Sequence, residues 1–219
     1  MATIADNLQA VKARIGLGKG VTLLAVSKGQ EAEKVRQAAA AGQKAFGENY
    51  VQEALEKMDA LPGLEWHLIG PLQSNKTRVV AERFQWVQTV EREKIARRLS
   101  EQRPASLPPL NVLVQVNISG EASKGGVSTD EVEGFLRKIS SLQRLRLRGL
   151  MAIPDPSRKN SLQLREMKKI FDRLKDEFQL DTLSMGMTDD MELAIAEGST
   201  MVRIGTAIFG ERRKEKSAA

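Results

Sequence analysis

The sequence predicts an α/β protein, built as a single (β/α)8 barrel. Strand-like and helix-like segments alternate along nearly the whole chain, and eight of them have strand character, the number that a closed parallel barrel requires. The length of 219 residues lies near the lower end for such a barrel, which fits short loops. No Gly/Ser linker, repeat or low-complexity stretch divides the chain, so we expect one domain over residues 1–219.

The spacing of apolar residues gives the elements in order. A first amphipathic helix is predicted over Ile4–Arg14, and this helix and a loop fill residues 1–20 before the barrel begins. The predicted strands are short apolar runs at Thr22–Ser27, Lys44–Phe46, Glu65–Ile69, Trp86–Thr89, Asn111–Ile118, Arg146–Ala152, Thr182–Ser184 and Met201–Ile204. The predicted helices between them are Glu31–Ala41, Val51–Met58, Lys76–Glu82, Arg92–Gln102, Thr129–Ser141, Ser161–Phe178 and Asp190–Ala196. An open, doubly wound sheet is the alternative fold, because it shares this alternation and differs in its strand count.

Composition excludes several classes of protein. The chain is 41% hydrophobic and 28% charged, which is typical of a globular domain. It has no cysteine, which excludes disulfides, thiol catalysis and Cys-based metal sites. With one histidine, His67, a multi-His metal site is not expected. No apolar run has transmembrane length and the first residues do not resemble a signal peptide, so we expect a cytoplasmic protein with no membrane partner.

The net charge of +6 raises the hypothesis of nucleic-acid binding. Aromatic residues make up only 4% of the chain, however, and basic residues alternate with acidic ones along the predicted helices. The densest basic run, Arg212–Lys216, falls in the last residues, 211–219, which we interpret as a flexible, solvated tail. We therefore predict no nucleic-acid partner.

Functional side chains of a barrel lie where strands end and the following loops meet. Lys28 closes the segment Thr22–Lys28, an unusual end for an apolar strand because burying its charge is costly. The segment alone is compatible with a surface lysine or with a desolvated amine that forms a Schiff base with a carbonyl compound.

The loops after the last two strands have the chemistry of a phosphate site. They run over Ser184–Asp190 and Gly205–Gly210, where glycines allow close backbone approach and hydroxyl and N–H groups can donate. We assign Ser184, Gly205 and Thr206 to phosphate. Asp189 and Glu192 have the spacing of a capping box, which indicates a helix start.

An arginine completes the constellation. Alternation along the last strand places Met201, Arg203 and Gly205 on one face and two β-branched residues on the other, which turns Arg203 into the barrel. A structural ion pair with an inward carboxylate is the alternative role for this arginine. An amine, a phosphate site and an inward arginine together match a phosphorylated aromatic aldehyde, and pyridoxal 5′-phosphate (PLP) is such a molecule.

Six motifs carry a resemblance over nearly the whole chain. They are Ala25–Lys28, Phe46–Glu53, Trp66–Lys76, Arg148–Ile153, Leu183–Met187 and Met201–Gly210. With them the chain resembles the small pyridoxal-phosphate homeostasis proteins, the YggS or PROSC family. The resemblance implies a barrel like the N-terminal domain of alanine racemase, the fold of type III PLP proteins.

The resemblance also implies roles for individual residues. Lys28 matches the lysine that holds the cofactor as a Schiff base, and Arg203 matches the arginine at the pyridine nitrogen. Ser184, Gly205 and Thr206 match phosphate-binding positions, and Asn49 and His67 match residues around the pocket. No catalytic residue and no metal ligand are implied.

Some positions depart from the family pattern or have a second interpretation. Gly29 and Gln30 follow the lysine where relatives often have Thr or Lys and then a proline, and Thr188 replaces a more usual serine. These changes affect the rim of the site. His67 is on the predicted inward face, where a hydrogen-bonded core histidine is the alternative to a ligand contact. Tyr50, the single tyrosine, fits a packing or rim role.

The preferred function is therefore a PLP-binding protein that stores, buffers or delivers the cofactor, and not an enzyme. An arginine disfavours protonation of the ring nitrogen, which weakens the electron sink that carbanion chemistry needs. The alternatives are a PLP-dependent amino-acid racemase of low activity and a sugar-phosphate enzyme that uses Lys28 as its amine. We expect a monomer whose candidate partners are PLP and the apo forms of PLP-dependent enzymes.

Overall fold

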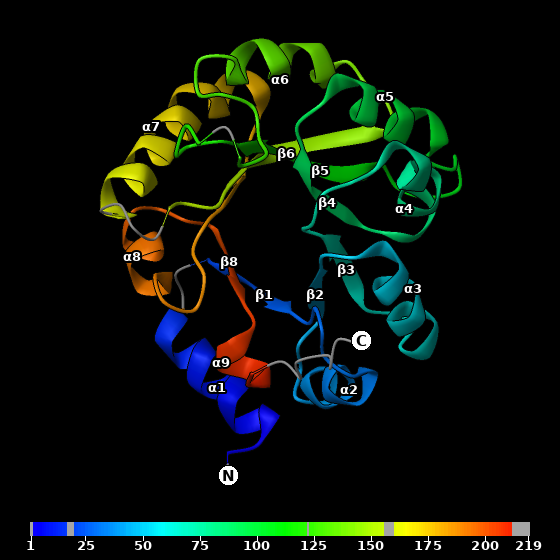
Figure 1. Ribbon diagram of the computed structural model, residues 1–219, viewed down its shortest axis with the longest axis vertical. Coiled ribbons are helices and arrows are strands. Elements are labelled where there is room, and N and C mark those ends of the chain that lie inside the picture. The colour runs from blue at the N-terminus through cyan, green and yellow to red at the C-terminus, as the bar shows by residue number, and fades with distance from the viewer. Residues whose placement is uncertain (1, 17–19, 122, 156–159, 212–219) are drawn as a thin grey trace, which may run out of the picture.

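The predicted barrel is confirmed. The computed structural model describes residues 2–16, 20–121, 123–155 and 160–211. Eight parallel strands close on themselves in the order β1 to β8, and helices surround them (Figure 1). Each strand pairs with its neighbours in sequence, and β1 pairs with β8 to complete the ring. The open-sheet alternative is wrong, because closure leaves no sheet edge.

The strands are β1 (Thr22–Val26), β2 (Ala45–Glu48), β3 (Glu65–Leu68), β4 (Trp86–Val90), β5 (Leu110–Val116), β6 (Leu145–Ala152), β7 (Thr182–Ser184) and β8 (Met201–Ile204). The α-helices are α1 (Ile4–Ile15), α2 (Ala32–Ala40), α3 (Val51–Ala60), α4 (Thr77–Arg83), α5 (Glu93–Gln102), α6 (Val132–Ser140), α7 (Asn160–Phe178), α8 (Met191–Ala196) and α9 (Thr206–Phe209). A 3-10 turn, η1 (Ser74–Lys76), precedes α4.

Two hydrophobic regions follow from the alternation of side chains along the strands. The larger one lies between the outer face of the sheet and the helices, where Phe46, Trp66 and Leu68 are buried. Inside the barrel the apolar residues form two small groups, Leu24 with Ala45 and Met201, and Trp86 with Leu113 and Met151. The rest of the interior is therefore open to polar side chains.

Helix α1 packs against helix α9, which follows β8. It begins with a capping box, in which the Thr3 hydroxyl accepts from the Asp6 amide at 3.1 Å and Asp6 accepts from the Thr3 amide at 2.9 Å. Further along α1, the Asn7 side chain donates to the Ile208 carbonyl in α9 at 3.1 Å. The two helices lie side by side in Figure 1, so the loop that leaves β8 is held from outside the barrel.

Two local predictions differ from the structure. Helix α9 lies within the segment that we had assigned to a loop, directly after Gly205. The capping box of Asp189 and Glu192 is wrong, because α8 begins one residue later, and the carboxylate of Asp190 accepts from the Met187 amide at 2.6 Å. Glu192 instead pairs with Arg14 of α1 at 2.7 Å, a tertiary contact that its local spacing could not reveal.

Several expectations concern the ends of the chain and its surroundings. Apart from Glu211, the predicted basic tail at 211–219 lies outside the described residues, as does part of the loop before β1. Within the described ranges, every helix is too short or too polar to serve as a membrane span. The same part of the chain contains no cluster of three or more side chains suited to hold a metal ion.

Candidate functional site

Four of the seven predicted ligand residues follow the carboxyl ends of three adjacent strands: Lys28, Asn49, Gly205 and Thr206. β1 lies between β2 and β8, with Val26 beside Gly47 and Ala25 beside Ile204. Asn49 follows β2 directly and Gly205 follows β8 directly, because these strands end at Glu48 and Ile204. Lys28 lies two residues after Val26, the last residue of β1. Lys28 and Asn49 are half-buried, and Thr206 is exposed. The structure thus brings the amine and two of the three predicted phosphate residues to one mouth of the barrel.

Two glycines set how closely the loops of this mouth approach one another. A Cβ atom on Gly205 would lie 3.1 Å from the carbonyl oxygen of Val26, at the end of β1. A Cβ on Gly70, which follows β3, would overlap the backbone of Asn49. A larger residue at Gly70 would therefore displace the backbone of Asn49, and one at Gly205 would crowd the end of β1 just before Lys28, which is a physical reason for glycine in both motifs.

Arg203 points into the barrel, as alternation along β8 predicts. It is 5% exposed. Its Nη1 donates to the Ser184 carbonyl and to the Ser184 Oγ, each at 2.8 Å, and its Nη2 donates to the Ala152 carbonyl at 2.9 Å. Burial lowers the pKa of Arg203 to about 10, an effect that the Asp190 carboxylate opposes. The guanidinium is thus a fixed cation at neutral pH, oriented by strands β6 and β7.

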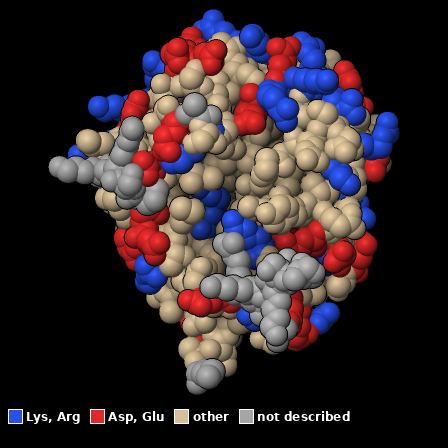
Figure 2. All heavy atoms as spheres, viewed as in Figure 1, with Lys and Arg blue, Asp and Glu red and all other residues tan. Residues whose placement is uncertain are grey.

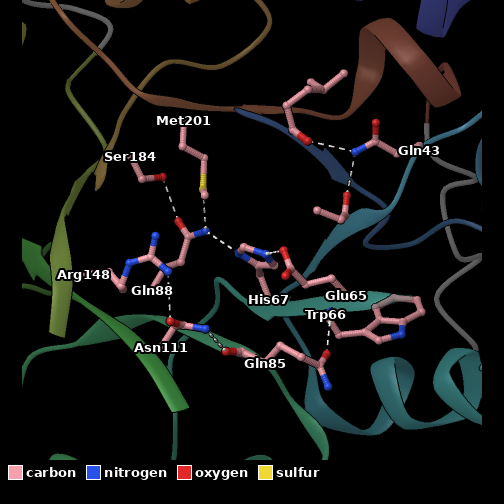
Figure 3. A network of polar contacts seen from close by, with 12 residues as sticks. Gln43, Glu65, Trp66, His67, Gln85, Gln88, Asn111, Arg148, Ser184 and Met201 are labelled. Carbon is pink, nitrogen blue, oxygen red and sulfur yellow. Dashed lines mark hydrogen bonds and ion pairs between the residues drawn. The ribbon is translucent and has the colours of Figure 1, made fainter. Parts of the chain in front are cut away.

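Ser184 is placed inside the barrel by the same contacts. Its side chain is fully buried; it accepts from Arg203 and donates to the Oε1 of Gln88 at 2.8 Å. The Nε2 of Gln88 in turn contacts the Nδ1 of His67 at 2.9 Å and the sulfur of Met201 at 3.2 Å. Figure 3 shows the contacts that run from Ser184 through Gln88 to His67 inside the barrel. The assignment of Ser184 to phosphate stays a prediction, and its hydrogen bonds give it a second role as a support for Arg203.

His67 lies at the other end of this series of hydrogen bonds, beyond Gln88. Its Nε2 is 2.9 Å from the Oε1 of Glu65, and its ring stacks on Trp86 with centroids 5.0 Å apart. Burial lowers the pKa of His67, although the hydrogen bond to Glu65 opposes this effect. A neutral ring fits both contacts: Nε2–H donates to the carboxylate, while Nδ1 accepts from the Gln88 amide. His67 is therefore a hydrogen-bonded residue of the barrel interior, and a contact between it and a ligand stays a prediction.

Sequence reasoning missed two groups of polar residues around the site. Gln88 connects three of the interior side chains, and its position two residues after Trp86, on the inward face of a strand, was the available signal. Lys57 and Glu48 form a buried ion pair at 2.7 Å behind the loop that carries Lys28. Burial raises the pKa of Glu48, which Lys57 opposes. Lys57 lies on the buried face of α3 next to Met58, and this position in the helical pattern could have indicated a buried ion pair.

Basic side chains also lie near the middle of one face of the molecule. Figure 2 shows Lys and Arg there, with uncharged residues above them and acidic residues to one side, in the view of Figure 1. Positive charge in a recess attracts an anionic ligand, because low-dielectric walls focus the field.

Residues 1–213 match the family model described as alanine racemase, N-terminal domain. Among curated proteins, a pyridoxal phosphate homeostasis protein of Pseudomonas aeruginosa is 55% identical over 223 residues, covering 97% of both chains. A protein of the same name from Escherichia coli strain K12 is 52% identical over 226 residues, covering 99% of this chain and 97% of the other. The chain belongs to the pyridoxal phosphate homeostasis protein family. The family that the six motifs indicated is thereby confirmed.

Solved structures agree with this membership. PipY of Synechococcus elongatus PCC7942, determined without PLP, has a TM-score of 0.88 and 36% identity, covering 95% of this chain and all of the other. The same protein with PLP bound has a TM-score of 0.85 and 35% identity, with the same coverage. Alanine racemase of Corynebacterium glutamicum, with a TM-score of 0.76 and 18% identity over 97% of this chain and 62% of the other, shares the fold.

Proposed function

We propose that this protein binds PLP at the mouth formed by β1, β2 and β8, and that it stores, buffers or delivers the cofactor. The convergence of Lys28, Arg203 and Gly205 in one barrel carries the proposal. The names of the relatives and the PLP-bound PipY structure support it. When bound, PLP supplies an aldehyde that reacts with a primary amine, a phosphate and a pyridine ring.

Lys28 is the residue that we assign to covalent attachment. It follows β1 at the barrel mouth, and the residue is partly exposed. The nearby Lys57 is a poor competitor: its ammonium group already donates to Glu48, Glu53 and the Ser27 carbonyl. Lys57 is also only 4% exposed, whereas Lys28 is half-buried, so the difference in exposure favours attachment at Lys28.

The remaining residues hold the non-reacting parts of the ligand. We assign Arg203 to the ring nitrogen, Asn49 and His67 to the wall of the pocket, and Ser184, Gly205 and Thr206 to the phosphate. Ser184 and His67 also belong to the interior network of hydrogen bonds that orients Arg203. The donor set fits PLP, because it combines an amine, a fixed cation and an exposed hydroxyl near a close-packed glycine.

The same arrangement supports a carrier in preference to an enzyme. A cation at the ring nitrogen disfavours its protonation, so the ring is a weak electron sink for the removal of an amino-acid proton. Steady racemisation of any common amino acid, abolished by Lys28→Ala, would contradict this part of the proposal. Apo forms of PLP-dependent enzymes are the candidate recipients, and the monomeric state and cytoplasmic location stay predictions.

Borohydride reduction followed by peptide mass mapping tests the site. The absorbance spectrum of the purified protein should first show a bound chromophore. After reduction, the pyridoxyl adduct should lie on Lys28, and Lys28→Ala should abolish the adduct while leaving the fold intact, because removing an amine from a barrel mouth opens no large cavity. An adduct mainly on Lys57, Lys76 or Lys124 would refute the assignment.

A further inference from the structure

A buried cluster of charges lies directly behind the loop that carries Lys28, and the function described so far does not use it. Lys57 projects from α3 and is 4% exposed. Its Nζ donates to the Oε1 of Glu48 at 2.7 Å, to the Oε1 of Glu53 at 2.7 Å and to the carbonyl oxygen of Ser27 at 2.6 Å. These three bonds match the three N–H groups of an ammonium ion, so the buried charge is satisfied.

The cluster forms hydrogen bonds with the backbone on both sides of Lys28. The carbonyl of Ser27, which Lys57 binds, belongs to the peptide that precedes Lys28. The amide of Gly29, which belongs to the peptide that follows Lys28, donates to the Oε1 of Glu53 at 2.6 Å. The two peptide groups that flank the proposed attachment residue are therefore held by one salt-bridged pair on α3.

Further contacts hold the same turn. The Gln30 amide donates to the Ser27 carbonyl at 3.1 Å, which closes a turn around Lys28 and Gly29. Gly29 has a φ of 68°, a left-handed value that the second central residue of a type II turn requires. The Ser27 hydroxyl also donates to Glu48 at 2.6 Å. The direction in which the Lys28 side chain leaves the backbone is thus set by bonds from outside the barrel mouth.

We propose that Glu53 and Lys57 are positioning residues, which hold the turn around Lys28 in the geometry that lets its amine condense with the aldehyde of PLP, a C=N bond forming as the aldehyde oxygen leaves as water. The proposal rests on the proposed function and extends it to residues that do not touch the ligand. If the turn were free to move, only a fraction of molecules would present the amine correctly, and apparent affinity would fall in proportion to that fraction.

Glu53 is the residue to change. Removing Lys57 would leave the buried carboxylate of Glu48 without its positively charged partner. The Oε2 of Glu48 already has no hydrogen-bond partner among the described residues, so this variant would lose stability for that reason alone. Glu53 is partly exposed, with 26% of its side chain accessible, and its loss leaves the Lys57–Glu48 pair in place. Glu56, which is exposed on the same helix, provides a matched control.

Comparing the affinities for two ligands distinguishes a role of Glu53 in positioning Lys28 from a role in supporting the whole pocket. PLP can bond covalently to Lys28, whereas pyridoxine 5′-phosphate has an alcohol in place of the aldehyde and cannot. In Glu53→Ala we expect PLP affinity to fall by about tenfold, the loss for a turn that is competent about a tenth of the time. Affinity for pyridoxine 5′-phosphate should stay within about twofold of the parent value, and Glu56→Ala should alter neither ligand.

Glu53→Gln should recover most of the PLP affinity, since its amide oxygen can still accept from Gly29. Unchanged PLP affinity in Glu53→Ala, or equal weakening of both ligands, would overturn the inference. The parent protein separates this failure from failure of the proposed function: without a reducible adduct on Lys28 in the parent, the proposed function itself is wrong. If Glu53→Ala unfolds, Glu53→Met is compared with Glu56→Met, because methionine keeps the length of the side chain but lacks the carboxylate that accepts from Gly29 and Lys57. A selective loss of PLP affinity in Glu53→Met supports positioning, and no selective loss refutes it.

Discussion

Replacing His67 by glutamine should remove a pH dependence from the stability of this protein. His67 is the only histidine in the chain, so it is the main side chain that titrates just below neutral pH. In the folded protein burial lowers its pKa, whereas in the unfolded chain the ring takes up a proton near pH 6.5. The unfolded state therefore binds more protons in this window, and the free energy of unfolding falls as the pH drops below that value.

The size of this pH dependence follows from the uptake of one proton by His67 on unfolding. Between the unfolded pKa and the lowered folded pKa, the free energy of unfolding should fall by up to about 1.4 kcal/mol for each pH unit. Urea denaturation of the parent and of His67→Gln, at several values between about pH 7.5 and 5.5, measures this slope. Because the pKa of Glu48 is raised by burial, Glu48 contributes with the opposite sign, but it is present in both proteins and the difference isolates His67.

Two outcomes would refute the reasoning. Equal slopes in the two proteins would mean that folding does not change how readily His67 binds a proton. A parent protein that gains stability relative to the variant as the pH falls would mean that Glu65, at 2.9 Å from the ring, outweighs burial and holds His67 in its charged form.

Two further substitutions test the pocket and the interior chain. Thr206→Val nearly preserves shape and removes one hydroxyl, so PLP should bind about one to two decades more weakly while unphosphorylated pyridoxal is hardly affected. Equal weakening in ligand titrations would mean that Thr206 supports the barrel end instead of the phosphate. Gln88→Leu leaves His67 and Ser184 each without one buried partner and should lower the free energy of unfolding by about 2–5 kcal/mol in urea denaturation. A loss below about 1 kcal/mol would show that these two hydrogen bonds contribute little.

The sequence by itself determined the eight strands, every α-helix except α9, and the family. The strands were readable because alternation and short apolar runs are local properties of a chain. The same alternation placed Arg203 inside the barrel before any contact was known, and the motif that ends at Lys28 placed an amine at the mouth. These predictions needed only the direction of each strand and the rule that loops after parallel strands meet at one end.

Only the tertiary structure decided which side chains meet. Gln88 and Ser184 are 96 residues apart and touch because the closed barrel brings β4 and β7 together across its interior. Lys57 reaches the Ser27 carbonyl, 30 residues earlier, because α3 packs against β2, the neighbour of β1 in the barrel. Partners at such separations depend on barrel closure and on the stagger of its strands, which no local pattern reports. The sequence could therefore locate Lys28, while the contacts that fix its direction became visible only in the folded chain.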